Sequence, residues 1–411
     1  MMITRVMKIV SSRWVLPISR PVIEDGSVVV ADGRIVDIGE RREILSKYPG
    51  TDEFRCPGTL LPGLINAHSH LELSHLRDIA APLPHHTFTD WIAGLLARRS
   101  TDHTSREERL AAVFALLRDQ HASGVVLVAD TGNEYLVELG KAAEGWPEIR
   151  RMLEYLGPDR QGDEAARLAI EGLDGLVAVT GHAPYSTGPE LLQYIKDRCR
   201  QFKQIFSIHT AESNAELQFL HSRTGIFRDF LEKRNRWDDT FACLGENFSG
   251  TIDYYDRLGL LDDRTLMVHC VHVSVPELQL AAERGAHICL CPGSNRFLKV
   301  GTAPVTHMIE AGILPALGTD SYASNPSIDL WREMQLLADD HPDLPPEQIL
   351  AMATLGGAQA LHVEQDYGSI EPGRKGRLLH ISSPALLQCR TATALIREVV
   401  TGGRPVETSW V

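Results

Sequence analysis

Eight short apolar runs recur between residues 60 and 320, and a helix-like segment follows each of them. The runs occupy residues 60–65, 124–130, 150–155, 176–182, 204–209, 265–269, 286–291 and 313–320. Repeated strand–helix units imply a parallel sheet covered by helices, and eight of them indicate a closed barrel. We therefore predict an α/β fold, a (β/α)8 TIM-like barrel. Residues 225–250 exceed a simple connection and are predicted to be an insertion over the barrel mouth, which either holds substrate or decorates the surface.

The two ends of the chain have a different character from the middle. Strand-like runs cover residues 28–30, 35–39, 378–381 and 396–403. Asp32-Gly33, between the first two, is a typical hairpin turn. We expect residues 1–58 and 366–411 to pair into one small β-sandwich domain beside a barrel of residues 59–365. Two separate β caps are the alternative.

The composition limits the partners of the chain. Its 411 residues include 41 Lys and Arg against 54 Asp and Glu, a formal net charge of −13. Because the chain is acidic and has no basic run, we expect no nucleic acid or membrane partner, but a small molecule and a homodimer. The seven cysteines show no CxxC pair, as in a cytoplasmic protein with reduced thiols. No signal-like segment is apparent, and no apolar run reaches ~18 residues.

Polar residues stand at the ends of several of these apolar runs. His68 and His70 follow the first run two residues apart, so in a strand both project to the same face. The fourth, fifth, sixth and eighth runs end in His182, His209, His269 and Asp320. In a barrel the carboxyl ends of all strands open onto one face, where such folds keep their active sites. A single His at a strand end is more often structural, but several in phase with the strands indicate a common site.

We predict that four of these residues bind one divalent metal ion: His68, His70, His209 and Asp320. Three imidazoles and one carboxylate suit Zn²⁺, and Fe²⁺ is also compatible with such ligands. A water molecule would complete the site. The metal would lower the pKa of that water towards ~7, which yields hydroxide at neutral pH.

Glu212 lies three residues after His209 and is predicted to carry protons. If a loop follows the strand there, the carboxylate can take a proton from the water and pass it to a ring nitrogen of the substrate. Hydrolysis at an amidine-like carbon requires this transfer. The alternative for Glu212 is a role in the first turn of the next helix. His269 is predicted to orient the attacking water, together with Asp320.

Six stretches of the chain match the motifs of a known family. They are PGLINAHSHLELS (62–74), GHAPYS (181–186), HTAES (209–213), VHCVHVS (268–274), CPGSNRFLKVGTAPV (291–305) and LGTDSYASNPSIDLWREM (317–334). On these motifs the chain resembles the amidohydrolase superfamily, in its mononuclear-metal deaminase branch. The resemblance implies a barrel enzyme whose two chain ends form a β domain. One departure lies at Gly376-Arg377, where the family usually has Ala-Asp, and it touches only the small domain.

Two features indicate the branch within that superfamily. Binuclear members usually place a carbamylated Lys on the fourth strand, whereas this chain has His182 there, so one metal is implied. A Glu three residues after the fifth-strand His is typical of deaminases of cytosine, guanine, adenosine derivatives and triazines. In that group the fourth-strand His lies near the substrate, which makes His182 a substrate contact. A structural role for His182 is the alternative.

The stretches at residues 70–74 and 319–327 resemble the aminodeoxyfutalosine deaminases of the menaquinone pathway, which replace the 6-amino group of an adenine nucleoside by oxygen. The resemblance favours 6-aminodeoxyfutalosine as substrate, with attack by metal-bound hydroxide and release of ammonia. The rivals are methylthioadenosine/S-adenosylhomocysteine deaminase and guanine or triazine deaminases. Ring-opening hydrolysis of a cyclic amide and a non-catalytic metal-binding scaffold are hypotheses of another class.

Further residues are predicted to contact the substrate: Glu72, Trp91, Ser294, Asn295 and Arg296. Glu72 could accept hydrogen bonds from ribose hydroxyls, or form a salt bridge with Arg77. Trp91 could stack on a base, or pack in the core. Ser294 and Asn295 follow the seventh strand and are expected to line the site. Arg296 could bind a substrate carboxylate, or form a surface salt bridge.

Overall fold

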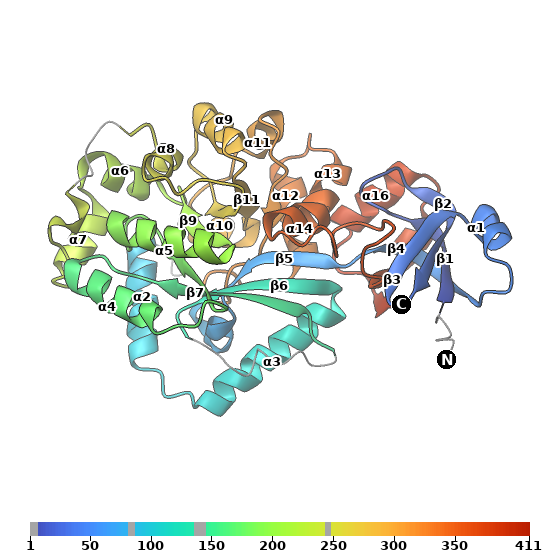
Figure 1. Ribbon diagram of the computed structural model, residues 1–411, viewed down its shortest axis with the longest axis horizontal. Coiled ribbons are helices and arrows are strands. Elements are labelled where there is room, and N and C mark those ends of the chain that lie inside the picture. Colours follow the sequence, from blue (N-terminus) through green and yellow to red (C-terminus); the bar gives the residue numbers. More distant parts are fainter. Residues whose placement is uncertain (1–6, 81–86, 135–144, 243–247) are drawn as a thin grey trace.

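The computed structural model describes residues 7–80, 87–134, 145–242 and 248–411 of the chain. Two parts are visible in Figure 1. The larger part contains the middle of the chain, with its strands surrounded by helices. The smaller part is a β-sheet that contains β1 and lies beside both labelled chain ends.

Eight parallel strands form the centre of the larger part, within the described ranges. They are β5 (Leu64–Ser69), β6 (Val125–Gly132), β7 (Glu148–Tyr155), β8 (Ala178–Gly181), β9 (Phe206–Thr210), β10 (Thr265–His269), β11 (His287–Leu290) and β12 (Ala316–Leu317). Hydrogen bonds join them into two four-stranded sheets, ordered β5-β6-β7-β8 and β9-β10-β11-β12. Each strand overlaps one of the eight apolar runs, so the predicted α/β fold is confirmed.

The two sheets meet along both of their edges. Between β8 and β9, the amide of His209 donates to the carbonyl of His182 at 3.0 Å. Between β12 and β5, the amide of Thr319 donates to the carbonyl of His68 at 3.0 Å, and Ser69 forms a parallel bridge with Asp320. The strands therefore follow one another in a ring, as in a (β/α)8 barrel. Both contacts lie at the carboxyl ends of the strands.

Helices pack around these strands, and each buries an apolar face. They are α3 (Arg106–Ala122), α4 (Arg160–Glu171), α5 (Pro189–Phe202), α6 (Asn214–Ser222), α8 (Thr251–Arg257), α9 (Val275–Glu283), α10 (Pro292–Leu298), α11 (Val305–Glu310), α12 (Leu330–Asp340), α13 (Pro346–Ala351) and α14 (Gly357–Ala360), with a π-helical turn at Met352–Gly356. In α5, Leu191, Ile195 and Cys199 are buried, because a spacing of four residues keeps them on one helical face. A capping box between Ser105 and Glu108 begins α3.

Three further segments contribute to the barrel mouth. They are the 3-10 segment Leu71–Ala80 after β5, α2 (Phe88–Ser100) and α7 (Ile226–Glu232). Helices α2 and α7 touch through the rings of Phe88 and Phe227, whose centroids are 5.9 Å apart. The predicted insertion at 225–250 contains α7 and a short 3-10 turn at Asp239–Phe241. Part of it, residues 243–247, lies outside the described residues.

The smaller part is a six-stranded sheet built from both ends of the chain. Its order is β14 (Glu407–Trp410), β13 (Leu378–Ser382), β4 (Glu53–Pro62), β1 (Met7–Val15), β2 (Ile23–Ala31) and β3 (Arg34–Glu40). The predicted β2–β3 hairpin is confirmed, with Asp32 and Gly33 at φ of 51° and 75°, as a type I′ turn requires. Hydrogen bonds link all six strands into one sheet where two stacked sheets were expected. Ile44 of α1 (Arg41–Lys47) packs on this sheet against Ile9 and Val29.

One predicted strand is a helix. Residues 396–403 fall largely within α16 (Ala392–Thr401), which follows the short α15 (Pro384–Gln388), so the strand prediction for this segment is wrong. Thr391 caps α16 by accepting from the amide of Ala394. Four apolar residues of the helix are buried: Leu395, Ile396, Val399 and Val400. Because their spacing places them on one helical side, the β-branched residues that favoured a strand instead form a buried helix face.

The first apolar run is divided between the two parts. Residues 60–62 end β4 in the small sheet, and residues 64–65 begin β5 in the barrel. A Cβ on the intervening Gly63 would lie 2.6 Å from the Cβ of Val126 and 2.9 Å from the ring of Trp410, so close packing of the two parts requires glycine here. Since β4 spans the boundary predicted between residues 58 and 59, we propose Gly63 as the crossing point between two domains.

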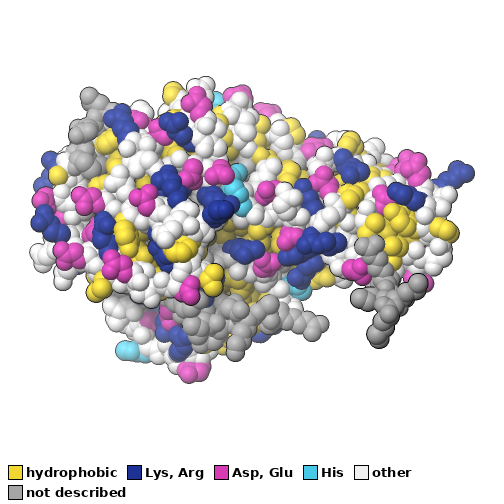
Figure 2. All heavy atoms as spheres, viewed as in Figure 1, with side chains coloured by type: hydrophobic (Ala, Val, Ile, Leu, Met, Phe, Trp, Pro, Cys, Tyr) yellow, Lys and Arg dark blue, Asp and Glu magenta, His cyan; other side chains and the backbone are white. Residues whose placement is uncertain are grey.

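Charges of both signs are mixed over the surface. Figure 2 shows Lys and Arg side chains interspersed with Asp and Glu on the visible face. The formal net charge of the whole chain is −13. Within the described ranges, none of the helices combines the length and the apolar character needed to cross a bilayer.

Gly318 connects β12 to Asp320 and is packed against β5. A Cβ at this position would lie 2.9 Å from the Cβ and the backbone nitrogen of His68, and 2.9 Å from Cys289 Sγ. We expect Gly318→Ala to lower the free energy of unfolding by about 1–3 kcal/mol, the usual cost of overpacking a core. Urea unfolding followed by circular dichroism measures this change.

Gly94→Ala is the matched control for that substitution. Gly94 is exposed in α2, and a Cβ there would meet nothing within 4 Å. Because Ala is a better helix former than Gly, this variant should be as stable as the wild type or slightly more stable. A loss of similar size in both variants would contradict the packing described for Gly318.

Candidate active site

The four predicted metal ligands meet at the carboxyl ends of the barrel strands. His68 lies in β5 and His70 follows it, His209 lies in β9, and Asp320 comes shortly after β12. The ring centroids of His68 and His70 are 4.7 Å apart, and those of His68 and His209 are 5.1 Å apart. His70 Nε2 lies 3.4 Å from Asp320 Oδ1. Three strands that are distant in sequence thus bring these side chains to one place.

His68 is the least satisfied side chain of this cluster. It is fully buried, and neither of its ring nitrogens has a hydrogen-bond partner among the described residues. Burial, reinforced by His70 and His209, holds the pKa of His68 well below its usual value, so the ring is neutral and offers a lone pair. A buried nitrogen without a partner costs about 1–3 kcal/mol. The cluster therefore fits a divalent metal ion, to which three neutral imidazoles and a carboxylate are suitable ligands.

A backbone carbonyl orients the ring of His209. Its Nδ1 lies 2.7 Å from the carbonyl oxygen of His182, to which an Nδ1–H donates. This bond leaves Nε2 of His209 as the atom with a free lone pair, the usual arrangement of a histidine that binds a metal. The ligand nitrogens of His68, His70 and His209 all lie within 4.8 Å of one another.

The backbone is strained where the strands reach this site. Ala211, His269 and Asp320 have φ of 47°, 73° and 58°. Residues other than glycine seldom adopt this region, and those that do cluster at active sites. Each of the three lies at or just after a strand end, where the chain turns sharply and presents a polar side chain.

Ser294 and Asn295, near the start of α10, bind other site residues. Ser294 Oγ donates to Asp320 Oδ2 at 2.7 Å, and Asn295 Oδ1 accepts from His269 Nδ1 at 2.9 Å. Burial opposes the ionisation of Asp320, but His70, His269 and Ser294 outweigh it, and the pKa of Asp320 lies below its usual value. Neither Ser294 nor Asn295 is among the residues found to line the cavity, so the structure places them as supports of Asp320 and His269.

Arg296 points to the surface. Its guanidinium forms an ion pair with Asp340 at 2.6 Å, and its side chain is 41% exposed. It is not among the described residues that line the cavity. The carboxylate-binding role is therefore corrected to its alternative, a surface salt bridge. Because α10 begins at Pro292, the helical rotation turns Arg296 away from the direction of Ser294.

Glu212 and His269 face each other beside the cluster. His269 Nε2 lies 3.6 Å from Glu212 Oε1, and both side chains are buried. Burial, with smaller contributions from Asp320 and Glu216, holds the pKa of Glu212 well above its usual value. Glu212 precedes α6 and lines the cavity. Its side chain therefore borders both the cluster and the cavity.

A cavity of about 190 Å³ is lined by these residues and by aromatic side chains. The aromatic side chains are Phe88 and Trp91 from α2, Tyr185, and Phe227 and Phe230 from α7. Tyr185 and Phe227 stack with ring centroids 3.7 Å apart, and Phe88 packs against both. Further polar side chains line the cavity: Glu72, Arg99, Asn133, Glu154, His182, Ser186 and Ser321. Such a mixed lining suits an organic ring system that carries hydrogen-bonding groups.

Trp91 and His182 both line this cavity. Trp91 Nε1 donates to the carbonyl of Ala323 at 3.0 Å, and His182 Nδ1 lies 2.6 Å from Ser186 Oγ. Burial, and next the neighbouring His209, hold the pKa of His182 well below its usual value. Both rings are thus held at one edge, and both remain candidates for substrate contact.

Glu72 is buried and lines the cavity. Its carboxylate accepts from the amide of Glu134 at 2.6 Å and from Arg99 at 3.3 Å. The partner weighed from the sequence, Arg77, instead donates to the hydroxyl of Tyr322. Glu72 thus forms a salt bridge with Arg99, which lies 27 positions further along the chain.

Glu154 and Arg99 also line the cavity, and neither was identified from the sequence. Glu154 lies near the end of β7, with Oε1 3.8 Å from His209 Nδ1. Burial, and then Glu72, raise the pKa of Glu154 to about 8. The sequence did contain an indication of Glu154. This residue stands near the end of the third apolar run, just as His182 stands at the end of the fourth. Arg99, in a helix, carried no such signal, nor did Phe88, Tyr185 and Phe227.

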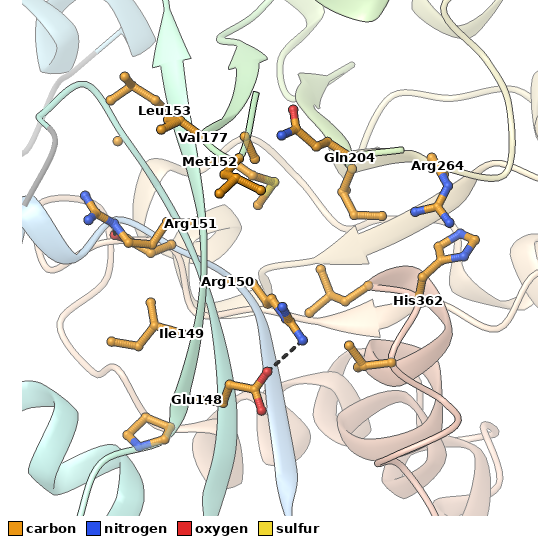
Figure 3. Close-up of a pocket in the computed structure, with 18 of the residues that line it drawn as sticks. Glu148, Ile149, Arg150, Arg151, Met152, Leu153, Val177, Gln204, Arg264 and His362 are labelled. Carbon is orange, nitrogen blue, oxygen red and sulfur yellow. Dashed lines mark ion pairs between the residues drawn. The ribbon is translucent and has the colours of Figure 1, made fainter. Parts of the chain in front are cut away.

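A larger cavity of about 610 Å³ runs along β7 (Figure 3). Its lining includes Glu148, Arg150, Gln204 and His362, and Arg150 pairs with Glu148 at 2.7 Å. Among the described residues, none of those predicted for the site lines this larger cavity. Size alone therefore does not identify the site in this molecule. The titratable groups converge in the smaller cavity at the carboxyl ends of the strands.

Fold and site together define a barrel hydrolase with a divalent metal site. The model of the amidohydrolase family matches residues 59–403. The chain belongs to this family and is a hydrolase that acts on C–N bonds.

Relatives with names and structures support the same assignment. The chain is 31% identical over 388 residues to the 5-methylthioadenosine/S-adenosylhomocysteine deaminase of Nitratidesulfovibrio vulgaris strain DP4. The alignment covers 86% of this chain and 78% of that protein. The crystal structure of Helicobacter pylori aminofutalosine deaminase with methylthio-coformycin is 25% identical, has a TM-score of 0.81 and covers 97% of each chain. The structure of an adenosine deaminase from Xanthomonas campestris with bound zinc is 23% identical and has a TM-score of 0.73, and the match covers 97% of this chain and 89% of that one. At this identity the likeness shows the fold alone.

We expect one divalent metal ion per chain, because the two groups of candidate ligands in the cluster, His68-His70-His209 and Glu154-His182-His209, share His209. His68→Ala should reduce the bound metal roughly tenfold or more, since even the loss of a residue that only supports a ligand costs about 10- to 100-fold in affinity. Elemental analysis by mass spectrometry after dialysis measures the stoichiometry. His307→Ala, at an exposed histidine of α11, is the control and should keep its metal. Two ions per chain, or full metal content in His68→Ala, would contradict this site.

Glu333 of α12 supports the segment that carries Ser294 and Asn295. Its carboxylate accepts from the amide of Gly293 at 2.7 Å and from the Asn325 side chain at 2.7 Å. Burial raises the pKa of Glu333 from 4.5 to about 8. Between these two pH values the folded protein keeps this proton, whereas the unfolded chain has released it.

Glu333 therefore makes the free energy of unfolding fall as the pH rises from about 5 to about 8, because the unfolded chain binds fewer protons in this window. Glu333→Gln cannot ionise and removes this contribution. We expect the stability of the wild type relative to the variant to decrease from about pH 5 to about pH 8. Urea unfolding of both proteins at several pH values tests this. A difference that stays constant, or grows in favour of the wild type as the pH rises, would refute it.

Proposed function

We propose that this protein is a hydrolytic deaminase of an adenine-type nucleoside, and we favour 6-aminodeoxyfutalosine, from the menaquinone pathway, as its substrate. The placement of Glu212 carries the proposal. This buried carboxyl group, with a raised pKa, lies 3.6 Å from His269 and beside the metal cluster. A scaffold that only binds a metal needs no such proton carrier. The likeness to aminofutalosine deaminase over 97% of both chains supports the substrate.

The residues of the site divide the reaction between them. A divalent metal held by the His68 cluster would act as a Lewis acid and lower the pKa of a water molecule. Asp320 and His269, themselves fixed by Ser294 and Asn295, hold that water against the ring carbon that bears the amino group. Glu212 takes a proton from the water and delivers it to a ring nitrogen. The remaining proton of the added hydroxyl passes to the amino group, the C–N bond breaks to release ammonia, and the oxygen stays as a carbonyl.

The cavity lining supports a purine in this position. Trp91 and Phe88 offer aromatic faces, and His182 lies where it can meet a ring nitrogen. Glu72 and Glu154 are acceptors for hydroxyl groups of a sugar. Guanine or triazine substrates would fill only the part of the cavity next to the cluster.

A second candidate is deamination of 5-methylthioadenosine or S-adenosylhomocysteine. It is favoured by the identity of 31% with a protein named for both substrates. The two candidates share the adenine ring and differ in the substituent on the sugar, so the same catalytic residues serve either. Ring-opening hydrolysis of a cyclic amide is disfavoured, because the fourth strand is followed by His182 where binuclear relatives place a lysine.

The proposal has three further parts. Zinc is favoured over iron, since a tetrahedral-type set of nitrogen and oxygen ligands without sulfur suits it. A cytoplasmic location follows from the scattered, reduced cysteines. A homodimer is the proposed assembly, and light scattering would measure it.

Glu212→Gln should keep its metal and lose turnover by a factor on the order of 10²–10⁴, the usual contribution of a positioned acid–base group. Ammonia release is measured with adenosine, 5-methylthioadenosine, S-adenosylhomocysteine and 6-aminodeoxyfutalosine. The metal content of the variant is measured in parallel. Glu283→Gln, at an exposed residue of α9, is the control and should retain full activity.

The outcome separates the role of the residue from the function of the protein. A near-normal rate in metal-loaded Glu212→Gln would remove Glu212 from the mechanism. No ammonia from any of the four nucleosides with the wild type would overturn the proposed function. A clear preference among the four nucleosides identifies the substrate.

A further inference from the structure

Arg99 is the only Lys or Arg, within the described parts of the chain, that lines the cavity beside the metal cluster. It lies in the last turn of α2, and its Nη2 is 3.3 Å from Glu72 Oε1. The Arg99 side chain is 38% exposed, whereas that of Glu72 is 6% exposed. The arginine therefore stands on the solvent side of this ion pair, at the entrance of the cavity.

The ion pair holds Arg99 in place and leaves it able to bind a second anion. Glu72 is itself anchored, because its other carboxylate oxygen accepts from the amide of Glu134 at 2.6 Å. The bond between Arg99 and Glu72 involves one guanidinium nitrogen. A guanidinium has five N–H donors in a planar fork, which matches the two oxygens of a carboxylate. An anion that enters from solvent can therefore pair with Arg99 without displacing Glu72.

Apart from Arg99 itself, the side chains that α2 and α7 contribute to the lining are apolar, and Glu72, 3.3 Å from Arg99, adds a charge. Helix α2 contributes Phe88, Trp91, Ile92, Leu95 and Leu96, and α7 contributes Phe227, Phe230 and Leu231. A substituent that extends from the metal cluster to Arg99 therefore contacts apolar and aromatic side chains before it meets the charge. Its favoured chemistry is an apolar or aromatic body with an anionic end.

We propose that Arg99 determines specificity by binding a carboxylate at the far end of an apolar substituent on the sugar of the nucleoside. The inference rests on the proposed function, since it requires the adenine ring at the metal cluster. It gives Arg99 the role that the sequence had suggested for Arg296, which is paired with Asp340 on the surface. Arg99 is a specificity residue here and takes no part in the chemical step.

Two synthetic nucleosides that differ only in the carboxylate test this proposal. One is adenosine with a phenylthio group on its 5′ carbon, and the other carries a carboxylate on that phenyl ring. The ratio of their kcat/KM values is measured with zinc-loaded wild type and variants. Their affinities are measured in parallel by calorimetry. The wild type should prefer the carboxylate compound.

Arg99→Met should lower this preference roughly 10- to 100-fold, the effect of losing a charge-assisted hydrogen-bonded pair. Arg99→Lys should keep part of it, because the charge remains but the planar fork is lost. Arg98→Met is the matched control. Arg98 is the neighbouring residue of the same helix, is 45% exposed, pairs with Asp102 and does not line the cavity. Its variant should keep the wild-type ratio.

Equal kcat/KM values for the two compounds with the wild type, or an equal loss for both in Arg99→Met, would overturn the proposal. If the wild type deaminates neither compound, calorimetry alone decides on Arg99, and the proposed function is judged on the four nucleosides named above. Tighter binding of the carboxylate compound that disappears in Arg99→Met would still support the specificity role. Absence of that preference in binding would overturn it as well.

Discussion

The structure depends on the burial of neutral imidazoles around a place that a cation can occupy. His68 is wholly buried, and its two ring nitrogens have no partner in the described part of the chain. A group of this kind is destabilising unless something binds it. These imidazoles lie where the two barrel sheets meet. The backbone carbonyls of His68 and His182 accept the hydrogen bonds that join the sheets at their two edges. His68 and His209 therefore contribute both candidate ligand side chains and backbone hydrogen bonds that join the barrel sheets.

Chemistry and selection of the substrate are assigned to different elements. The strand ends carry the cluster, His269 and, just after β9, Glu212, so these side chains are held by the two hydrogen-bonded sheets of the barrel. The cavity lining farther from the cluster comes largely from α2 and α7, which lie outside the ring of strands. Elements of this kind change more readily than strands do. Under the proposed function, this division lets the substituent on the sugar be selected without a change in the catalytic residues.

Much of the site was accessible from the sequence because strand ends have a local signature. A buried strand of a parallel barrel is a short apolar run, and the polar residue that ends it must face the carboxyl-end surface. His68, His70, His209 and Asp320 all follow this rule, and the structure brings them together. The rule failed where a helix intervened. Arg296 follows Asn295 directly, but the turn of α10 directs its side chain to the surface. Residues 396–403 have the composition of a strand, yet most of them lie in the helix α16.

The sequence by itself determined the eight strands and pointed to the candidate ligands and proton carrier at their ends, because each strand and the polar residue that follows it are close together in the chain. Only the tertiary structure decided which side chains complete the cavity. Glu72 pairs with Arg99, Tyr185 stacks on Phe227, and Glu154 approaches His209. These contacts join elements whose separation in sequence carries no periodic signal. The first two arise from the packing of α2 and α7 over the barrel and the third from the approach of β7 and β9, and both are set by side-chain shape and burial and not by local pattern.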